Sequence, residues 1–515
     1  MMRSLALAAA LLAASVSAQL NGTYTINPAL PASPTNFATL TSARDALYLV
    51  AGISGPVVFE IYDDAGPFVE IMGTGYTTWQ PANANLVLPH IPTANATNTV
   101  TFRAAPGEFP VFNASGLGFG IFFKGADYVT IEGIEIFGAN NDGIFAWTDS
   151  NVNSTMDRNT FRGLKIHDCQ ASGISFYGNP NLISDCVVEN CVFWNLQGTY
   201  LGAGQTPGGY QGNGRFAHVS QRRGIRTVIR NNTFWLDSGA SNNTLLSAIG
   251  DNPAAAGTVS LQEVSNNIVV TGPSVNAYCM WLGGSATPPT ISEANCWFHQ
   301  SPVGFTNNAA WSTFQTWQSA TTRDLLSITQ NPQLADPTGI IARDFHLNYG
   351  SPCIDFGSGT SAKDFDGTPR DLCGDIGADE YNHGSAISYI GSGCSGLTGV
   401  PNLATFGCNP IIGNFNFGFF LSNAAANAPA IVLINAGIAS IPLAGCSAEV
   451  DLASNILLLT LGTGPSGDLL LPLGLPADPL LVGISAYVTM AVADAGATNG
   501  VGFSITPTMQ VTIGQ

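Results

Sequence analysis

The stretches VENCVFW (188–194) and IRNNTFW (229–235) share one pattern, in which a charged residue precedes Asn and a strand-like run ends in Trp. Four other segments follow the same pattern: IEGIEIF (131–137), FRGLKIH (161–167), VSNNIVV (264–270) and SEANCWF (292–298). The six segments start 30, 27, 41, 35 and 28 residues apart. Because the shortest intervals suit one coil of three short strands and the longer ones leave room for insertions, these repeats predict a β-solenoid.

Three positions of the repeat predict how successive coils stack. The third position is Gly or Asn in five segments, and both residues tolerate the left-handed backbone of a tight turn. The fourth is Asn in the last three segments, where stacked amides can form a hydrogen-bonded ladder. The sixth is apolar throughout, which predicts an interior column: Ile136, Ile166, Phe193, Phe234, Val269 and Trp297. We therefore expect an all-β protein built on a right-handed parallel β-helix.

The repeated V/I-x-N-N/C-x-F pattern resembles that of the pectate-lyase-like β-helix superfamily, over roughly residues 100–345. The segment DFHLNYGSPCIDFGSGTSAKDFDGTPRDLCGDIGADEY (344–381) is similar to a terminal segment of many secreted bacterial β-helix proteins, which implies a C-terminal cap for the solenoid. Residues 391–515 look like the β-sandwich module of some exported bacterial proteins, which implies surface association or sorting.

The expected organisation has five parts. They are a signal peptide (1–18), an N-terminal cap with the first coils (19–120), the parallel β-helix (121–343), its C-terminal cap segment (344–383) and the β-sandwich module (391–515). A basic start at Met1–Arg3, the apolar run Leu5–Ala14 and the small-residue pattern Val16–Ala18 are typical of a secretory signal. No later stretch approaches twenty apolar residues, so we expect a soluble protein that is secreted, extracellular or on the cell surface.

Ten cysteines in an exported chain predict disulfides, whose connectivity the sequence leaves open. The net charge of −18 argues against nucleic acid as a partner and does not favour an anionic membrane.

Five of the sixteen basic residues lie in RFAHVSQRRGIRTVIR (215–230). In the aligned repeats, Arg230 stacks on Glu189, which stacks on Arg162, and a second column places Arg226 and Arg158 on either side of Asp185. Opposite charges on neighbouring strands stabilise a sheet by about 0.2–1 kcal/mol each. Arg226 and Arg230 are therefore predicted to be structural.

The remaining basic residues of this stretch end an insertion at 195–223 that the repeat does not explain, and long aperiodic loops are often functional. The candidate catalytic residues are Arg222, Arg223 and His218, and Arg215 and Lys165 are candidates for binding a sugar chain. In a uronate lyase, a cation of this kind would neutralise the sugar carboxylate or take the α-proton. A solvated loop that offsets negative charge is the alternative.

Aromatic residues beside this insertion could bind a glycan. Trp194 and Trp235 follow equivalent strands and would form a platform beside the insertion, unless the insertion folds back and buries them. Tyr210 of the Gly-rich insertion is a further candidate for binding sugar. Asp142 and Asp168 could converge as an acid/base pair, although both lie in ordinary turn sequences.

The sequence leaves calcium binding open. The stretch DFDGTPRD (364–371) fails the EF-hand spacing, and the histidines lack metal-ligand spacing. The sequence thus predicts a protein that binds extracellular polysaccharide and leaves lyase or hydrolase activity open. The alternative is a non-catalytic surface or adhesion protein.

Overall fold

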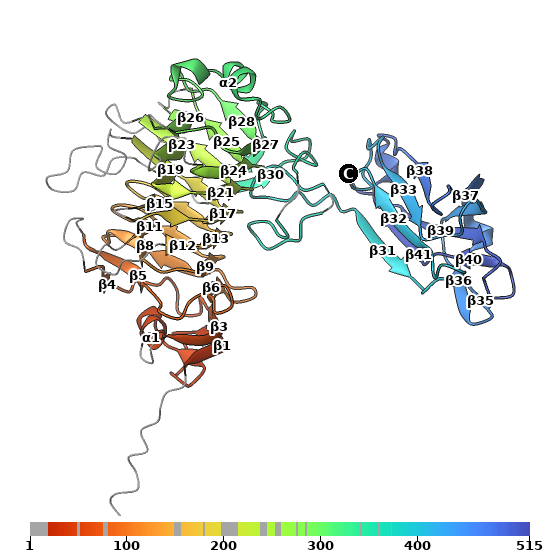
Figure 1. Ribbon diagram of the computed structural model, residues 1–515, viewed down its shortest axis with the longest axis horizontal. Helices are drawn as coiled ribbons and strands as arrows, with labels where there is room; N and C mark the ends of the chain where they lie inside the picture. The colour runs from red at the N-terminus through yellow and green to blue at the C-terminus, as the bar shows by residue number, and fades with distance from the viewer. Residues whose placement is uncertain are drawn as a thin grey trace, which may run out of the picture. The chain divides into compact units, whose positions relative to one another are not determined.

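A computed structural model describes residues 19–48, 52–75, 81–148, 156–178, 181–196, 215–236, 245–252, 259–273, 277–283, 286–339, 342–358, 361–371 and 373–515. The described residues form two compact units (Figure 1). The first comprises the chain up to Arg370 together with Gly374–Glu380, and the second comprises Asp371–Cys373 and Tyr381–Gln515. The expected signal peptide lies outside the described residues. None of the described helices has the length and apolarity needed to cross a membrane.

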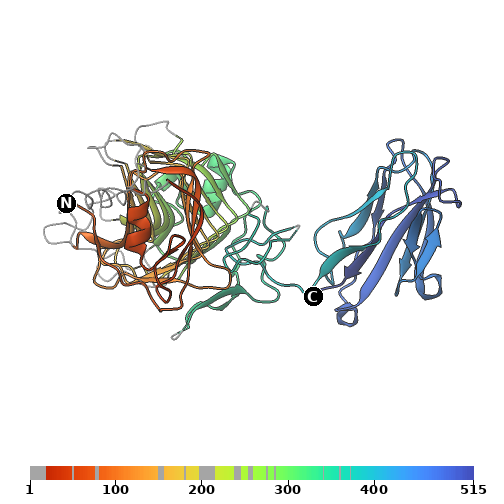
Figure 2. The same ribbon diagram turned by 90° about the horizontal axis from the view of Figure 1, so that it is seen from below.

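The first unit is a right-handed parallel β-helix, as the repeats predict, and its coils are seen nearly end-on in Figure 2. Its first sheet runs β2 (Asn36–Phe37), β1 (Leu20–Ile26), β3 (Ile53–Ile61), β6 (Val100–Ala104), β9 (Val129–Glu132), β13 (Thr160–Arg162), β17 (Val187–Glu189), β21 (Thr227–Arg230), β24 (Leu261–Ser265) and β27 (Ile291–Glu293). The second sheet runs β28 (Cys296–His299), β25 (Ile268–Thr271), β22 (Thr233–Leu236), β18 (Val192–Trp194), β14 (Lys165–His167), β10 (Glu135–Phe137) and β7 (Val111–Asn113).

The third sheet runs β26 (Ala277–Leu282), β23 (Leu245–Asn252), β19 (Arg215–Arg222), β15 (Ile174–Tyr177), β11 (Ile144–Trp147), β8 (Phe119–Lys124), β5 (Asn83–Pro89) and β4 (Met72–Gly73). A small corner sheet joins β12 (Met156–Asp157), β16 (Ile183–Ser184) and β20 (Gly224–Ile225). In the three large sheets every pairing is parallel except that of β4 with β5, so each coil adds one strand to each sheet.

The repeat positions take the conformations that the sequence predicts. All six third-position residues have positive φ, from 53° at Asn266 to 69° at Gly133. The three fourth-position asparagines form a buried ladder, in which the Asn232 Nδ2 donates to Asn267 Oδ1 at 3.0 Å and the Asn267 Nδ2 donates to Asn295 Oδ1 at 3.1 Å. The sixth-position side chains are buried in the core. Turn, ladder and core therefore keep successive coils in one register.

The two ends of the coil stack are covered by short helices. Helix α1 (Leu40–Ala46) begins at the N-cap Thr39 and buries Leu40 and Ala43. At the other end lie the 3₁₀ turn Ala309–Trp311 and helix α2 (Phe314–Thr321), whose Trp317 is fully buried and donates from Nε1 to Asp324 at 2.8 Å. Figure 1 shows α2 beyond the last coil. Helix α2 therefore closes this end of the core.

The segment after the solenoid packs along the side of the coils, which differs from the expected end cap (Figure 2). It contains the hairpin β29 (Leu334–Asp336) and β30 (Asp344–Leu347). The buried guanidinium of Arg370 donates to the carbonyls of Gly377 and Ala378 at 2.7 and 3.0 Å, and to Asn190 Oδ1 at 3.2 Å. Gly377 N in turn donates to Asn266 O at 2.8 Å. These contacts join the segment to the turns between the first and second sheets.

The second unit is a module of antiparallel sheets with its own core, which fits the expected β-sandwich. One sheet runs β31 (Ala386–Ile390), β41 (Thr508–Thr512), β39 (Ser485–Ala493), β34 (Pro429–Asn435) and β37 (Asn455–Gly462), with β40 (Phe503–Ile505) beside β39. The other runs β32 (Asn402–Phe406), β33 (Gly418–Ser422) and β38 (Leu469–Pro472), and β35 (Ser440–Leu443) pairs with β36 (Cys446–Glu449).

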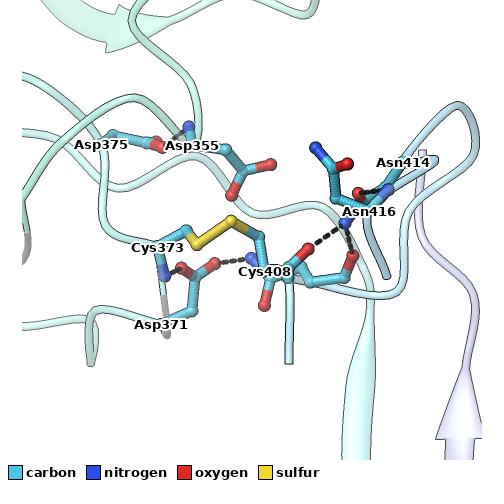
Figure 3. Close-up of a disulfide and its surroundings, with 9 residues drawn as sticks. Asp355, Asp371, Cys373, Asp375, Cys408, Asn414 and Asn416 are labelled. Atoms are coloured by element: carbon cyan, nitrogen blue, oxygen red, sulfur yellow. Dashed lines mark hydrogen bonds between the residues drawn. A yellow bond between two sulfur atoms is a disulfide. The ribbon is translucent and has the colours of Figure 1, made fainter. Parts of the chain in front are cut away.

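Two disulfides lie in the second unit, Cys373–Cys408 and Cys394–Cys446. The carboxylate of Asp371 accepts from Cys373 N at 3.0 Å, beside the first disulfide (Figure 3). It also accepts from the side-chain amide of Asn409. The six other cysteines are buried and reduced. The first disulfide therefore covalently ties the short segment 371–373 to the rest of its unit.

The asparagine ladder generates a stability prediction. Replacing Asn267 by Ala leaves donors and acceptors of two neighbouring coils unpaired in the core, so we expect the free energy of unfolding to fall by about 2–4 kcal/mol. The measurement is chemical denaturation followed by circular dichroism. The exposed Asn331→Ala is the control and should change stability by less than about 0.5 kcal/mol. Equal effects from both variants would show that the ladder adds nothing.

Candidate functional site

The second position of the repeat forms a column of alternating charges on the outer face of the first sheet. Strand register stacks Glu60, Arg103, Glu132, Arg162, Glu189 and Arg230 in that order, and we call these six residues the charge ladder. The shortest contacts are Arg103 Nη2–Glu60 Oε1 at 2.6 Å, Arg162 Nε–Glu189 Oε1 at 2.7 Å and Arg230 Nη2–Glu189 Oε2 at 2.9 Å. The predicted stack of Arg162, Glu189 and Arg230 is confirmed, and it continues over three earlier coils.

The second predicted column is also confirmed. Arg226 donates from Nε and Nη2 to the two carboxylate oxygens of Asp185 at 2.7 and 2.6 Å, and Arg158 Nη2 lies 4.0 Å from Asp185. The hydrogen bonds from Arg226 hold the pKa of Asp185 below its usual value. Because the Arg226 side chain is half exposed, this pair stabilises the fold less than the buried part of the charge ladder does.

The charge ladder forms one side of a groove with a volume of about 1010 Å³. The groove is lined by Arg103–Phe109, Glu132–Glu135, Arg162, Gly163, Lys165, Glu189, Arg230 and Ser361–Gly367. Phe109 is 67% exposed, so its ring is accessible in the groove. The arrangement therefore combines ionic hydrogen-bonding groups with one accessible aromatic face.

The wall at Ser361–Gly367 is held by groups far away in the sequence. The Asn190 Nδ2 donates to Ser361 Oγ at 2.5 Å and to Lys363 O at 2.6 Å. Phe365 N donates to Ala378 O at 3.0 Å, and Asp364 Oδ1 accepts from Thr368 N at 2.7 Å. These bonds fix the loop beside the ladder, so the groove is preformed.

A cluster of ionisable side chains lies at one end of this wall. Lys165 Nζ is 3.5 Å from Asp366 Oδ1 and 4.9 Å from the centre of the Phe365 ring. His346 Nε2 lies 2.6 Å from Asp366 Oδ2, and His346 Nδ1 lies 2.5 Å from Asp344 Oδ1. The hydrogen bond with Asp366, more than any other contact, raises the pKa of His346 to about 9. His346 is therefore a cation at neutral pH.

The candidate catalytic residues Arg222, Arg223 and His218 do not line the groove, and the sequence prediction that 215–222 is part of a loop is wrong. Strand β19 pairs with β15 and β23 in the third sheet. His218 points into the core between Phe193 and Phe234 and is 1% exposed. Burial lowers the pKa of His218 to about 3, so the ring is neutral and cannot reach a surface ligand in this structure.

The arginines at the end of β19 have other partners. The Arg222 guanidinium lies 4.9 Å from the centre of the Tyr177 ring and donates to its hydroxyl. Arg223 has a left-handed backbone with φ of 56°. Arg215 is placed by its backbone pairing with Leu245, and Tyr210 lies outside the described residues. Of the candidate binding residues that the structure describes, Lys165 alone lines the groove.

The predicted aromatic platform exists as a column, and another strand partly covers it. The rings of His167 and Trp194 stack with centroids 4.0 Å apart, and Trp235 follows on the next coil. Phe345 of β30 lies 5.2 Å from Trp194 and 6.5 Å from Trp235, between ring centroids. A strand more than a hundred residues away in sequence therefore packs beside the tryptophans, which stay half-buried, and glycan binding by this column stays a prediction.

The two candidate carboxylates, Asp142 and Asp168, have different surroundings. Asp142 is fully buried, and its Oδ1 accepts from Ser172 N at 3.1 Å and from Ser175 Oγ at 2.8 Å. Asp168 lies 2.6 Å from His167 Nδ1, and that hydrogen bond lowers the pKa of Asp168. Asp142 thus serves the buried turn before β15, whereas Asp168 pairs with His167, and an acid/base role for the two stays a prediction.

Three carboxylates that sequence reasoning missed gather beside the groove. Asp63, Asp64 and Glu108 place one oxygen each within 4.8 Å of the others. Asp63 N donates to Glu108 Oε2 at 3.1 Å, and the side-chain hydrogen bond with Asp63 raises the pKa of Glu108. Oxygen ligands of this kind suit calcium. The cluster lies outside the repeats, so no periodic signal marked it.

Comparisons with known proteins gave one family match and several similar solved structures. A family model described as a right handed beta helix region matches residues 98–234. Similar solved structures include an alginate lyase from Paenibacillus sp. (16% identity, TM-score 0.30, covering 56% of this chain and 99% of the lyase) and pectate lyase Pel9A (13%, 0.23, 71% and 98%). A tailspike of an Acinetobacter baumannii bacteriophage, a capsular polysaccharide depolymerase, is 12% identical (TM-score 0.23, 96% and 85%). No curated protein matches the sequence.

The charge ladder generates a second prediction. Glu189 is 5% exposed and is the nearest carboxylate to two arginines. Glu189→Gln leaves Arg162 and Arg230 only their longer contacts with Glu132 (3.8 Å) and Glu263 (4.0 Å), and should lower the free energy of unfolding by about 2 kcal/mol. Asp185→Asn removes the corresponding carboxylate from the more exposed column and should cost less than about 1 kcal/mol. Urea denaturation of both variants checks the difference. A larger loss for Asp185→Asn would contradict this ranking.

The His346 cluster generates a third prediction, on pH. Because the folded pKa of about 9 exceeds the unfolded value of roughly 6.5, the contribution of His346 to stability is complete below pH 6.5 and is lost as the pH rises through 9. The melting temperature of the first unit should therefore fall between pH 7 and 9.5, and less so in His346→Gln. Proton NMR titration of the imidazole measures the pKa directly. A midpoint at or below 6.5 would refute the assignment.

Proposed function

We propose that this protein binds extracellular polysaccharide in the groove between the charge ladder and the loop Ser361–Gly367. The exposed Phe109, in a groove that is also lined by eleven charged residues, is the observation that carries the proposal. A sugar ring offers an apolar C–H face to an aromatic ring and hydroxyl groups to ionic side chains. The groove supplies both kinds of contact within one preformed space.

The dimensions of the groove support the same conclusion. A volume of about 1010 Å³ lies at the upper end of the range for small-molecule sites, so several sugar units can enter. The ladder runs along the coil axis with one rung roughly every 4.8 Å. A chain that follows the stack would therefore meet alternating donors and acceptors along its length.

Secretion, surface attachment through the second unit and calcium binding remain parts of the proposal. Disulfides in the second unit are compatible with an oxidising compartment. Lyase or hydrolase chemistry also stays a prediction. Arg222 is engaged with Tyr177, so a lyase role for Arg222 or Arg223 would have to act outside the groove.

The proposal predicts that Phe109→Ala weakens polysaccharide binding about tenfold, which corresponds to about 1.4 kcal/mol. The measurement is affinity gel electrophoresis in a panel of soluble polysaccharides, followed by calorimetry with those that retard the protein. Phe356→Ala is the matched control, since Phe356 is also an exposed phenylalanine of the first unit but lies outside the groove. Unchanged binding by Phe109→Ala would place the binding site elsewhere.

A further inference from the structure

We infer that the groove selects an uncharged oligosaccharide and excludes polyuronates, an inference that rests on the proposed function. The reason is that the ladder arginines and Lys165 are already neutralised by carboxylates of the protein. Each ladder arginine lies within 2.9 Å of a carboxylate oxygen, and Lys165 lies 3.5 Å from Asp366. A polyuronate brings one negative charge for every sugar and finds no unpaired cation among these residues.

The charge of the lining points the same way. Its five cations, Arg103, Arg162, Lys165, Arg230 and Lys363, face six carboxylates, Glu108, Glu132, Glu135, Glu189, Asp364 and Asp366. The lining therefore carries a formal charge of −1, in a chain whose net charge is −18. Of the described lining cations, only Lys363 has no carboxylate partner, and it lies exposed at the rim. The lining thus offers a polyanion no net positive charge.

A uronate could obtain a cation only by separating a ladder arginine from its carboxylate, and this separation is unfavourable. Glu189 is 5% exposed and accepts from Arg162 and Arg230 together. A uronate that drew either arginine away would leave this buried carboxylate with one arginine instead of two, and the loss of one partner opposes the exchange. The ladder therefore keeps its own pairs when a ligand binds.

A neutral sugar can use these pairs without breaking them. An arginine has five N–H donors and a carboxylate has about four acceptor sites, so paired groups keep free donors and acceptors. The Arg162 side chain remains 41% exposed and that of Glu132 remains 35% exposed, with Arg162 Nη1 3.8 Å from Glu132 Oε2. Two adjacent hydroxyls of a sugar can accept from the arginine and donate to the glutamate, while Phe109 packs on the ring.

The test compares two classes of probe in the presence of EDTA, which removes calcium bridges. The neutral probes are xylan, galactomannan and mixed-linkage β-glucan, and the acidic probes are polygalacturonate and alginate. We expect at least one neutral probe to bind, with affinity that changes less than twofold between 50 and 300 mM NaCl, and neither acidic probe to bind. The double variant Glu132→Gln/Glu135→Gln changes the formal charge of the lining from −1 to +1 and should gain affinity for polygalacturonate at low salt.

The outcomes separate the two proposals. Binding of an acidic probe that is weakened tenfold in Phe109→Ala would overturn the inference and leave the groove as a polysaccharide site. Failure of both probe classes to bind would overturn the proposed function and the inference with it. Circular dichroism of each variant shows that a lost signal is not lost folding.

Discussion

The rest of the structure depends on one constraint, the strict register between neighbouring coils. A left-handed residue at the third position of each repeat turns the chain at the same point, and the buried Asn232–Asn267–Asn295 ladder ties the later turns together. Since stacked strands lie about 4.8 Å apart, whatever occupies a position on one coil meets the same position on the next. The sequence of one coil is therefore restricted by its neighbours.

This restriction acts most strongly on charged residues at the same position of neighbouring coils. Two like charges 4.8 Å apart at an effective dielectric constant of 20 repel by about 3 kcal/mol, and a column of them would open the stack. Alternation of sign from Glu60 to Arg230 replaces this repulsion by attraction. An acidic protein with only sixteen basic residues thus uses several of them where carboxylates already stand in register.

These features could be predicted because they repeat. The coil fold, the left-handed turns, the interior column and both charge columns follow from aligning six short segments. Strand β19 was missed because an insertion precedes it, although Val219 takes the same place as Ile174 on the previous coil. The loop Ser361–Gly367 and the cover of Phe345 over Trp194 could not be predicted, since they depend on contacts between residues far apart in sequence.

The candidate site arises where the regular solenoid meets such non-repeating segments. The ladder alone is an open face on which Glu and Arg alternate regularly, so no coil differs enough from its neighbours to mark a site. Asn190 changes this, because it both forms a left-handed turn of the coil and holds the backbone of the loop beside the ladder. One side of the groove is thus periodic and the other unique, and Phe109 at its rim comes from a turn outside the repeats. The groove therefore combines charges that the coil register fixes with an aromatic contact that a non-repeating segment supplies.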